Sequence, residues 1–112
     1  MEQLAREFEE LGYVADLSFR QQGVLVIKEF KVEAGRFAGQ TVAVGVPAAD
    51  YPMTPPAGIH LCPGLAPVGQ NNITQSPLGP GWHYWSRRLT DWKADRSARH
   101  VVSYVNKVLL DA

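Results

Sequence analysis

The chain has 112 residues, of which 46% are hydrophobic and 20% charged, and this composition excludes a disordered protein. Eleven basic side chains balance eleven acidic ones, which argues against a general nucleic-acid binder because such a protein needs a basic surface. No apolar run approaches the roughly 20 residues that cross a bilayer, and the N-terminus has no signal-peptide pattern. The one cysteine, Cys62, excludes an internal disulfide. We expect one domain over residues 1–112, in a reducing cytoplasm, with no nucleic-acid or membrane partner.

The N-terminal half of the chain predicts a helix followed by strands. Leu4, Phe8 and Leu11 recur at spacings of four and three, which is typical of one face of a helix over residues 1–11. Gly12 is expected to end this helix, since glycine enters the left-handed conformation cheaply. Alternating residues and then β-branched residues predict two strands that form a hairpin, and two further strands are expected where prolines bound the chain. The expected strands are residues 13–20, 24–32, 41–46 and 57–62.

Proline dominates the middle of the chain. All eight prolines lie between residues 47 and 80, and because proline lacks an N–H, this region is unsuited to a central strand or a helix interior. Residues 63–81 show no periodicity. We therefore expect a long loop there, and such loops are usually functional or mobile.

The chain ends in a predicted helix. Val101, Val105 and Val108 recur at helical spacing, and Asp95 or Ser97 is the expected N-cap. Helices that flank an antiparallel meander make an α+β two-layer sandwich. The expected architecture is thus an N-terminal helix, a four-stranded antiparallel meander, a proline-rich loop, an aromatic segment and a C-terminal helix.

Few residues are suited to chemistry. His60 and Cys62 are two residues apart on a predicted strand, so their side chains share one face. Cys62 is then either a nucleophile with His60 as its partner or a small buried side chain, and the sequence leaves both interpretations open. No spacing supplies four metal ligands, so we expect neither a metal nor a cofactor. The side chains considered as ligands are His60, Cys62, His83 and His100.

Residues 82–92 contain four aromatic side chains. Trp, Tyr and Arg dominate interface hot spots, so this segment is a candidate for binding a partner. The alternative is that the tryptophans, Trp82 and Trp85 among them, fill one end of the core and that Arg87 caps backbone carbonyls.

Two motifs resemble a known family. Residues Tyr51 to Pro56 read Tyr-Pro-Met-Thr-Pro-Pro, which is similar to the Tyr-Pro-x-x-Pro-Pro motif of ubiquitin-conjugating enzymes and falls between the third and fourth expected strands, as in that family. The segment Trp82-His83-Tyr84-Trp85-Ser86-Arg87, followed by Trp92, resembles a bacterial branch of proteins like these enzymes. That branch commonly has His after Trp-Ser-Arg, whereas this chain has Arg88.

The resemblance implies a carrier function. A ubiquitin-like protein, activated by an adenylating enzyme, would pass as a thioester to this protein and then to an amine or hydroxyl of a protein target. The proline-rich loop would be the active-site loop, and binding would involve the two motifs. Operons of the bacterial branch encode a ubiquitin-like protein, an activating enzyme and a JAB-type peptidase, and are often interpreted as antiphage defence. The binding residues implied are Tyr51, Pro52, Pro55, Pro56, Trp82, Trp85 and Arg87.

The acceptor residue does not follow from the motif. The eukaryotic family has a His-Pro-Asn motif and a cysteine roughly twenty residues after the Pro-Pro pair, and this chain has neither. Three possibilities stay open: Cys62 is the acceptor, which we prefer because a thioester stores acyl-transfer energy; Ser76 accepts the chain as an oxyester; or the protein is a non-catalytic binding module. An unrelated α+β domain with a chance proline motif is a further reading. Supporting roles would fall to Asn71 or Asn72 as oxyanion donor and His83 as base.

Overall fold

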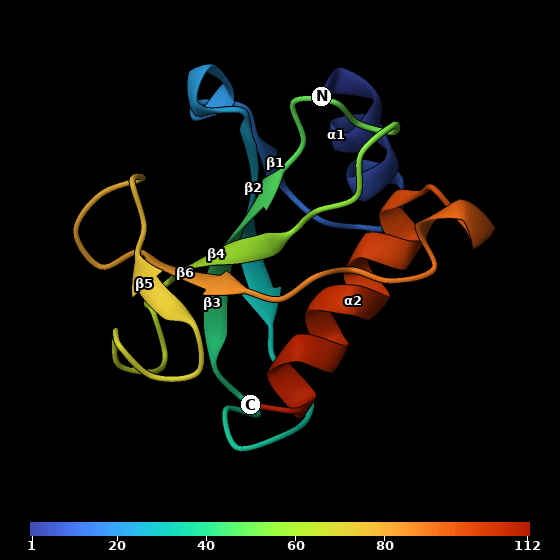
Figure 1. The fold of residues 1–112 in the computed structure, drawn as a ribbon. Coiled ribbons are helices and arrows are strands. Elements are labelled where there is room, and N and C mark those ends of the chain that lie inside the picture. Colours follow the sequence, from blue (N-terminus) through green and yellow to red (C-terminus); the bar gives the residue numbers. More distant parts are fainter.

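The protein consists of a six-stranded antiparallel sheet with two helices on one face (Figure 1). The computed structural model describes residues 1–112. The strand order is β1-β2-β3-β4-β6-β5. The elements in chain order are α1 (Glu2–Glu10), β1 (Ala15–Asp16), the 3-10 turn η1 (Arg20–Gln22), β2 (Val24–Lys31), β3 (Thr41–Pro47), β4 (Gly58–Cys62), β5 (Ile73–Gln75), β6 (His83–Ser86), the 3-10 turn η2 (Trp92–Ala94) and α2 (Ala98–Leu110).

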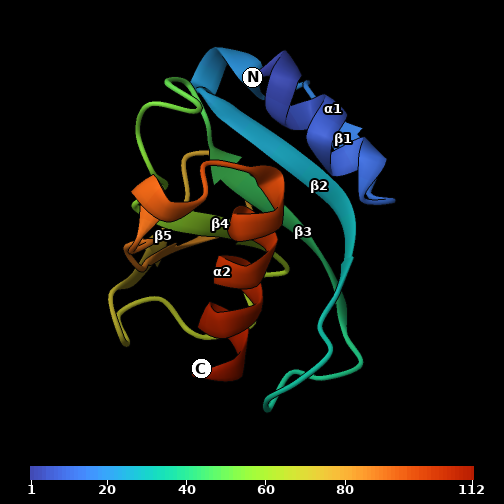
Figure 2. The same cartoon turned by 90° about the vertical axis from the view of Figure 1, so that its right-hand side faces the viewer.

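The core lies between the two helices and the inner face of the sheet. Figure 2 shows α2 crossing in front of the strands, with α1 beside β1 and β2. Phe8 of α1, Val105 of α2 and Leu61 of β4 are all fully buried in one apolar cluster. Burial of these helical stripes accounts for the periodicity that predicted both helices, and the expected α+β architecture is confirmed at this level. Neither helix has the length and apolar character needed to cross a membrane.

The expected four-stranded meander is present, but the sheet does not stop there. β1 to β4 pair in sequence order, and β6 then pairs with β4 while β5 pairs with β6 at the edge. The expectation of four strands was therefore wrong by two. β5 and β6 have three and four residues, too few for alternation to be recognised along the chain. β5 also interrupts the expected loop over residues 63–81.

β4 lies in the middle of the sheet, although prolines surround it. It pairs with β3 on one side and β6 on the other. Pro56 precedes it and Pro63 follows it, but no proline lies within it. Every N–H of its interior is therefore available for pairing, and the exclusion of a central strand from the proline-rich region was too broad.

The expected strand over residues 13–20 is also corrected. Only Ala15 and Asp16 pair with β2. The Asp16 carboxylate accepts hydrogen bonds from the backbone N–H of Ser18 at 2.9 Å and from the Ser18 hydroxyl at 3.0 Å. This side-chain turn competes with strand pairing, and the chain continues into η1.

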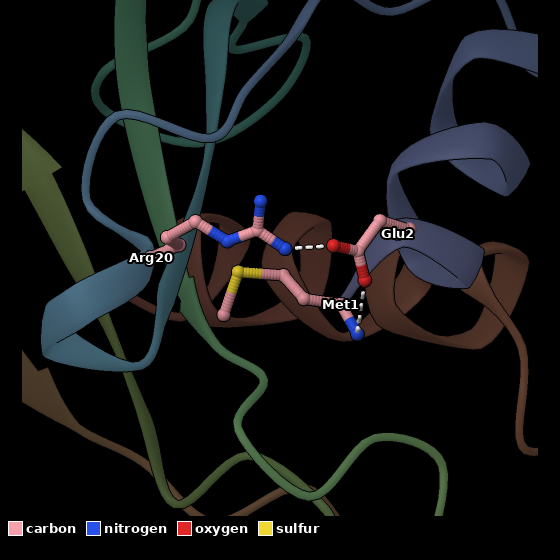
Figure 3. A network of polar contacts seen from close by, with 3 residues as sticks. All are labelled: Met1, Glu2 and Arg20. Atoms are coloured by element: carbon pink, nitrogen blue, oxygen red, sulfur yellow. Dashed lines mark ion pairs between the residues drawn. The ribbon is translucent and has the colours of Figure 1, made fainter.

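An exposed ion-pair network joins the start of α1 to η1 (Figure 3). The Glu2 carboxylate forms an ion pair with Arg20, and its other oxygen lies 3.9 Å from the Met1 ammonium nitrogen. Because the Glu2 and Arg20 side chains are about half exposed, solvent screening keeps the stabilisation small.

Glu7 of α1 caps the first turn of α2. Of the two expected N-cap residues, Asp95 and Ser97, the structure has Ser97 at this position. The Ser97 side chain itself makes no capping bond. The Ala98 N–H donates instead to Glu7 Oε1 at 2.9 Å, and the Tyr51 hydroxyl donates to the same oxygen at 2.8 Å. Burial raises the pKa of Glu7, but these bonds and one from Gln3 outweigh it, so the pKa lies below its usual value.

Glu7→Ala is expected to lower the free energy of unfolding by about 1–2 kcal/mol, because it removes a helix cap and leaves the Tyr51 hydroxyl with only the Arg96 carbonyl as acceptor. Urea denaturation would measure the loss. The matched control is Glu9→Ala, an exposed position on the same helix. Equal losses in the two variants would contradict the capping role.

Candidate functional site

The single thiol lies at the end of β4, where the strand meets the long connection to β5. Cys62 is half-buried and pairs in register with Ala43 of β3. Its side chain shares the outer face of the sheet with His60, as expected, whereas Ile59 and Leu61 are fully buried on the inner face against the helices. The thiol therefore stands on the side of the sheet that carries no helix.

A buried histidine and serine meet on this outer face. His60 is 6% exposed and Ser76 is 3% exposed, and His60 Nδ1 lies 2.7 Å from the Ser76 hydroxyl oxygen. The Leu78 N–H also donates to that oxygen at 3.1 Å. Burial lowers the pKa of His60 to about 4, so the imidazole is neutral at neutral pH. The pair is a neutral hydrogen bond between β4 and the chain that follows β5.

That following chain folds back over the outer face. We call residues Ser76–Trp82, which connect β5 to β6, the flap. Leu78 of the flap lies over Gly45 of β3, where an added Cβ would come within 3.2 Å of the leucine side chain and 3.0 Å of His60 Cβ. Gly45 is thus required for the flap to pack this closely. In Figure 1 this segment lies on the side of the sheet away from both helices.

The flap reaches the thiol at Gly81. A Cβ placed on Gly81 would lie 3.6 Å from Cys62 Sγ, and the residue has a φ of +84°. The neighbouring Trp82 packs edge-to-face against Phe19, with ring centroids 5.7 Å apart. The flap therefore shields one side of Cys62 while the thiol stays partly exposed.

The burial of Ser76 bears on its expected role as an alternative acceptor. Its hydroxyl is occupied by His60 and Leu78, and only 3% of the residue is exposed. A protein carboxyl terminus therefore has no route to this oxygen while the flap covers it.

His83 lies away from the thiol. It pairs with Leu61, so its side chain is on the inner face, opposite to that of Cys62. Its Nδ1 lies 2.7 Å from the Ala66 carbonyl oxygen, and because a carbonyl only accepts, Nδ1 carries the proton. The ring thereby fixes the connection after β4, and the structure does not direct it toward Cys62 as a base.

Asn71 and Asn72 lie at the far end of β6 from the thiol. The Asn72 carbonyl accepts from the Ser86 N–H at 3.1 Å, and the Asn71 carbonyl accepts from the Arg87 guanidinium. Ser86 is three residues beyond His83, a distance of about 10 Å along a strand. The two asparagines and Arg87 line a separate cleft of about 380 Å³ and are not brought to Cys62.

The aromatic segment mostly fills the core. Trp85 and Trp92 are 1% and 5% exposed, and only Trp82 is half-buried. Arg87 donates to the Asn71 and Ser86 carbonyls and lies over the Trp85 ring. The second interpretation of this segment is therefore confirmed for three side chains: Trp85 and Trp92 fill the core, and Arg87 caps backbone carbonyls.

The Tyr-Pro-x-x-Pro-Pro motif lies in the connection from β3 to β4 and contacts both α1 and the segment between β6 and α2. The Tyr51 hydroxyl bonds to Glu7, and its ring packs edge-to-face against Trp92 at 5.9 Å. The Trp92 indole N–H donates to the Pro52 carbonyl at 2.8 Å, and the Leu89 N–H donates to the Pro56 carbonyl at 3.2 Å. Pro52 and Pro55 are half-buried, so some motif surface stays accessible.

Two side chains of the flap region had no signal in the sequence. The Gln75 amide donates to the Gly79 and Trp82 carbonyls, each at 3.1 Å, and so ties the flap internally. Leu78 is an isolated apolar residue in a segment without periodicity. The sequence Gly79-Pro80-Gly81 is typical of a turn, but it does not indicate what the turn covers.

Comparisons with protein-family models, with curated proteins and with solved structures found no match to this chain. No group of three or more His, Cys, Asp or Glu side chains converges where an ion could be held. The fold therefore defines the class only as an antiparallel α+β sandwich, and its function is argued from the site.

Proposed function

We propose that this protein is a carrier resembling ubiquitin-conjugating enzymes, which accepts an activated ubiquitin-like protein on Cys62 and transfers it to a protein target. The observation that carries the proposal is the partly exposed thiol at the end of the central strand β4, beside a long connection. The order of α1, the β1–β4 meander and α2, with the Tyr-Pro-x-x-Pro-Pro motif between β3 and β4, supports it. The pathway would be a bacterial conjugation system of the kind interpreted as antiphage defence.

The chemistry needs only one accessible sulfur on this chain. The Cys62 thiolate attacks the thioester carbonyl that joins the ubiquitin-like protein to its activating enzyme, a new C–S bond forms, and the enzyme's cysteine leaves as thiolate. A target amine then attacks the new thioester, the C–S bond to Cys62 breaks, and the amine proton goes to solvent or to the departing sulfur. No cofactor takes part in either step.

The test is the intact mass of the protein after incubation with the activating enzyme and ubiquitin-like protein encoded in such an operon, together with ATP. The expected result is an adduct of one ubiquitin-like chain that disappears when reductant is added. Because Cys62 is the only cysteine, a thioester on this chain has no other possible site.

Cys62→Ser is expected to abolish the reductant-sensitive adduct and to leave the thermal unfolding midpoint nearly unchanged, since serine is close in size and the site is partly exposed. The matched control is Ser103→Ala, at an exposed position on α2. A reductant-sensitive adduct on Cys62→Ser, or a reductant-resistant adduct on the unmodified chain, would contradict the assignment of Cys62.

A second candidate is a non-catalytic binding module of the same class. It is favoured by the absence of a histidine directed at Cys62: His60 Nδ1 is bonded to Ser76, and His83 lies on the other face of the sheet. This function predicts binding of the ubiquitin-like protein or activating enzyme in calorimetry, with equal affinity for the unmodified chain and Cys62→Ser, and no adduct.

A further inference from the structure

The flap behaves structurally as one unit. The Ser76 N–H donates to the Trp82 carbonyl at 3.1 Å, and the Trp82 N–H donates to the Gly79 carbonyl at 3.2 Å. The Gln75 amide bonds to both of these carbonyls from beside the flap. These bonds close the flap on itself, so it is expected to move as a rigid piece about its two ends rather than to unravel.

The attachment of the flap to the rest of the sheet is sparse. Its one hydrogen bond outside the β5–β6 hairpin joins the Ser76 hydroxyl to His60 of β4. The other attachments are apolar: Leu78 over Gly45, and Trp82 against Phe19. The buried Ser76–His60 bond is therefore the polar fastening that holds the flap against the outer face.

The position of this fastening matters for the thiol. His60 and Cys62 are two residues apart on the same face of β4, and the flap that begins at Ser76 passes beside Cys62 at Gly81. Without the Ser76 hydroxyl, the His60 nitrogen is buried and unpaired while the flap lies against the sheet. When the flap moves away, water bonds to that nitrogen, so loss of the hydroxyl favours the open arrangement.

We propose that the flap gates Cys62 and that Ser76 and His60 are positioning residues which hold the gate closed. In the closed state small molecules reach the thiol and large ones are hindered by the flap; in the open state a protein-sized partner can approach the sulfur. The inference rests on the proposed function for its biological meaning, because that function requires a protein to reach Cys62, but the gate is a property of the isolated chain.

The experiment measures the alkylation rate of Cys62 with two reagents, iodoacetamide and a polyethylene-glycol maleimide. For each reagent, the rate with Cys62 is divided by the rate with free glutathione. In the wild-type protein this ratio is expected to be smaller for the maleimide than for iodoacetamide. Ser76→Ala is expected to raise the maleimide rate about fivefold, the change in the population of the open state that loss of one neutral hydrogen bond produces. Leu78→Ala is expected to raise it as well, and Ser103→Ala to leave it unchanged.

Hydrogen exchange in the same variants separates opening of the flap from loss of the whole fold. In Ser76→Ala the amides of β3 and α2 should keep their protection, and so should those of Ser76 and Trp82, whose hydrogen bonds lie within the flap and move with it. Unchanged maleimide rates in both Ser76→Ala and Leu78→Ala would overturn the proposal. Faster alkylation accompanied by loss of protection in β3 and α2 would overturn it as well, because the whole fold would then be opening. Neither result depends on thioester formation, so the gate and the carrier function are tested independently of each other.

Discussion

Trp85→Ala is expected to lower the free energy of unfolding by about 3–5 kcal/mol, because it removes a large fully buried ring and leaves a cavity. Trp85 is 1% exposed and packs edge-to-face against Phe37, with ring centroids 6.3 Å apart. Its indole N–H also donates to the Gly64 carbonyl at 3.0 Å. A domain of this size has a total stability of about 5–15 kcal/mol, so this substitution removes a large part of it.

Urea denaturation followed by circular dichroism would measure the change. Trp85→Phe keeps an aromatic ring but loses the N–H and part of the ring volume, so its loss should be smaller and should combine the Gly64 bond with a smaller cavity. Trp82→Ala, at the half-buried tryptophan of the flap, should also cost less. A loss below about 1 kcal/mol for Trp85→Ala would place the ring at the surface and restore the partner-binding interpretation of the aromatic segment.

The stability of the protein is expected to fall as the pH decreases from 6.5 to about 4, because burial lowers the pKa of His60 from 6.5 to about 4. Above this window His60 is neutral in both the folded and the unfolded states. Within it the unfolded chain binds a proton that the folded protein excludes, so the free energy of unfolding falls. At roughly 1.4 kcal/mol per pKa unit, the total loss is about 3 kcal/mol, and it levels off below the folded pKa.

Urea denaturation at a series of pH values would show this slope, and His60→Gln should remove most of it. Glutamine does not titrate, yet it can still bond to Ser76. The upper part of the window is the most informative, since the pKa of Glu7 lies below 4.5 and its contribution is lost only at lower pH. An equal slope in wild type and His60→Gln between pH 6.5 and 4.5 would show that His60 is not held neutral by the fold.

Both predictions concern parts of the chain that the sequence described incompletely. The sequence identified His60, Ser76 and Trp85 one by one, but it did not pair His60 with Ser76, which lie 16 residues apart. It named Asn71, Asn72 and His83 as possible helpers of Cys62, and the structure places them elsewhere. A candidate role inferred from residue type carries no information about which strand end or sheet face a side chain occupies.

The sequence alone determined the elements whose side chains repeat over several turns or strand positions. The periodicity of residues 1–11 and of the C-terminal valines predicted α1 and α2, a β-branched run predicted β2, and the prolines that bound them helped to delimit β3 and β4. These patterns are local, because each is produced within a single helix or strand whose apolar face packs against the core. The place of the Tyr51 motif between β3 and β4 followed from the same local reading.

Only the tertiary structure decided the rest. β5 and β6 are too short to show a period; β6 is a strand because β4 offers an edge on which to pair, and β5 is a strand because β6 offers the next edge. Glu7 caps a helix that begins 91 residues later, and Ser76 fastens a flap over a thiol that precedes it in the chain. Each of these arrangements depends on contacts between residues distant in sequence, and such contacts exist only once the sheet has brought their elements together.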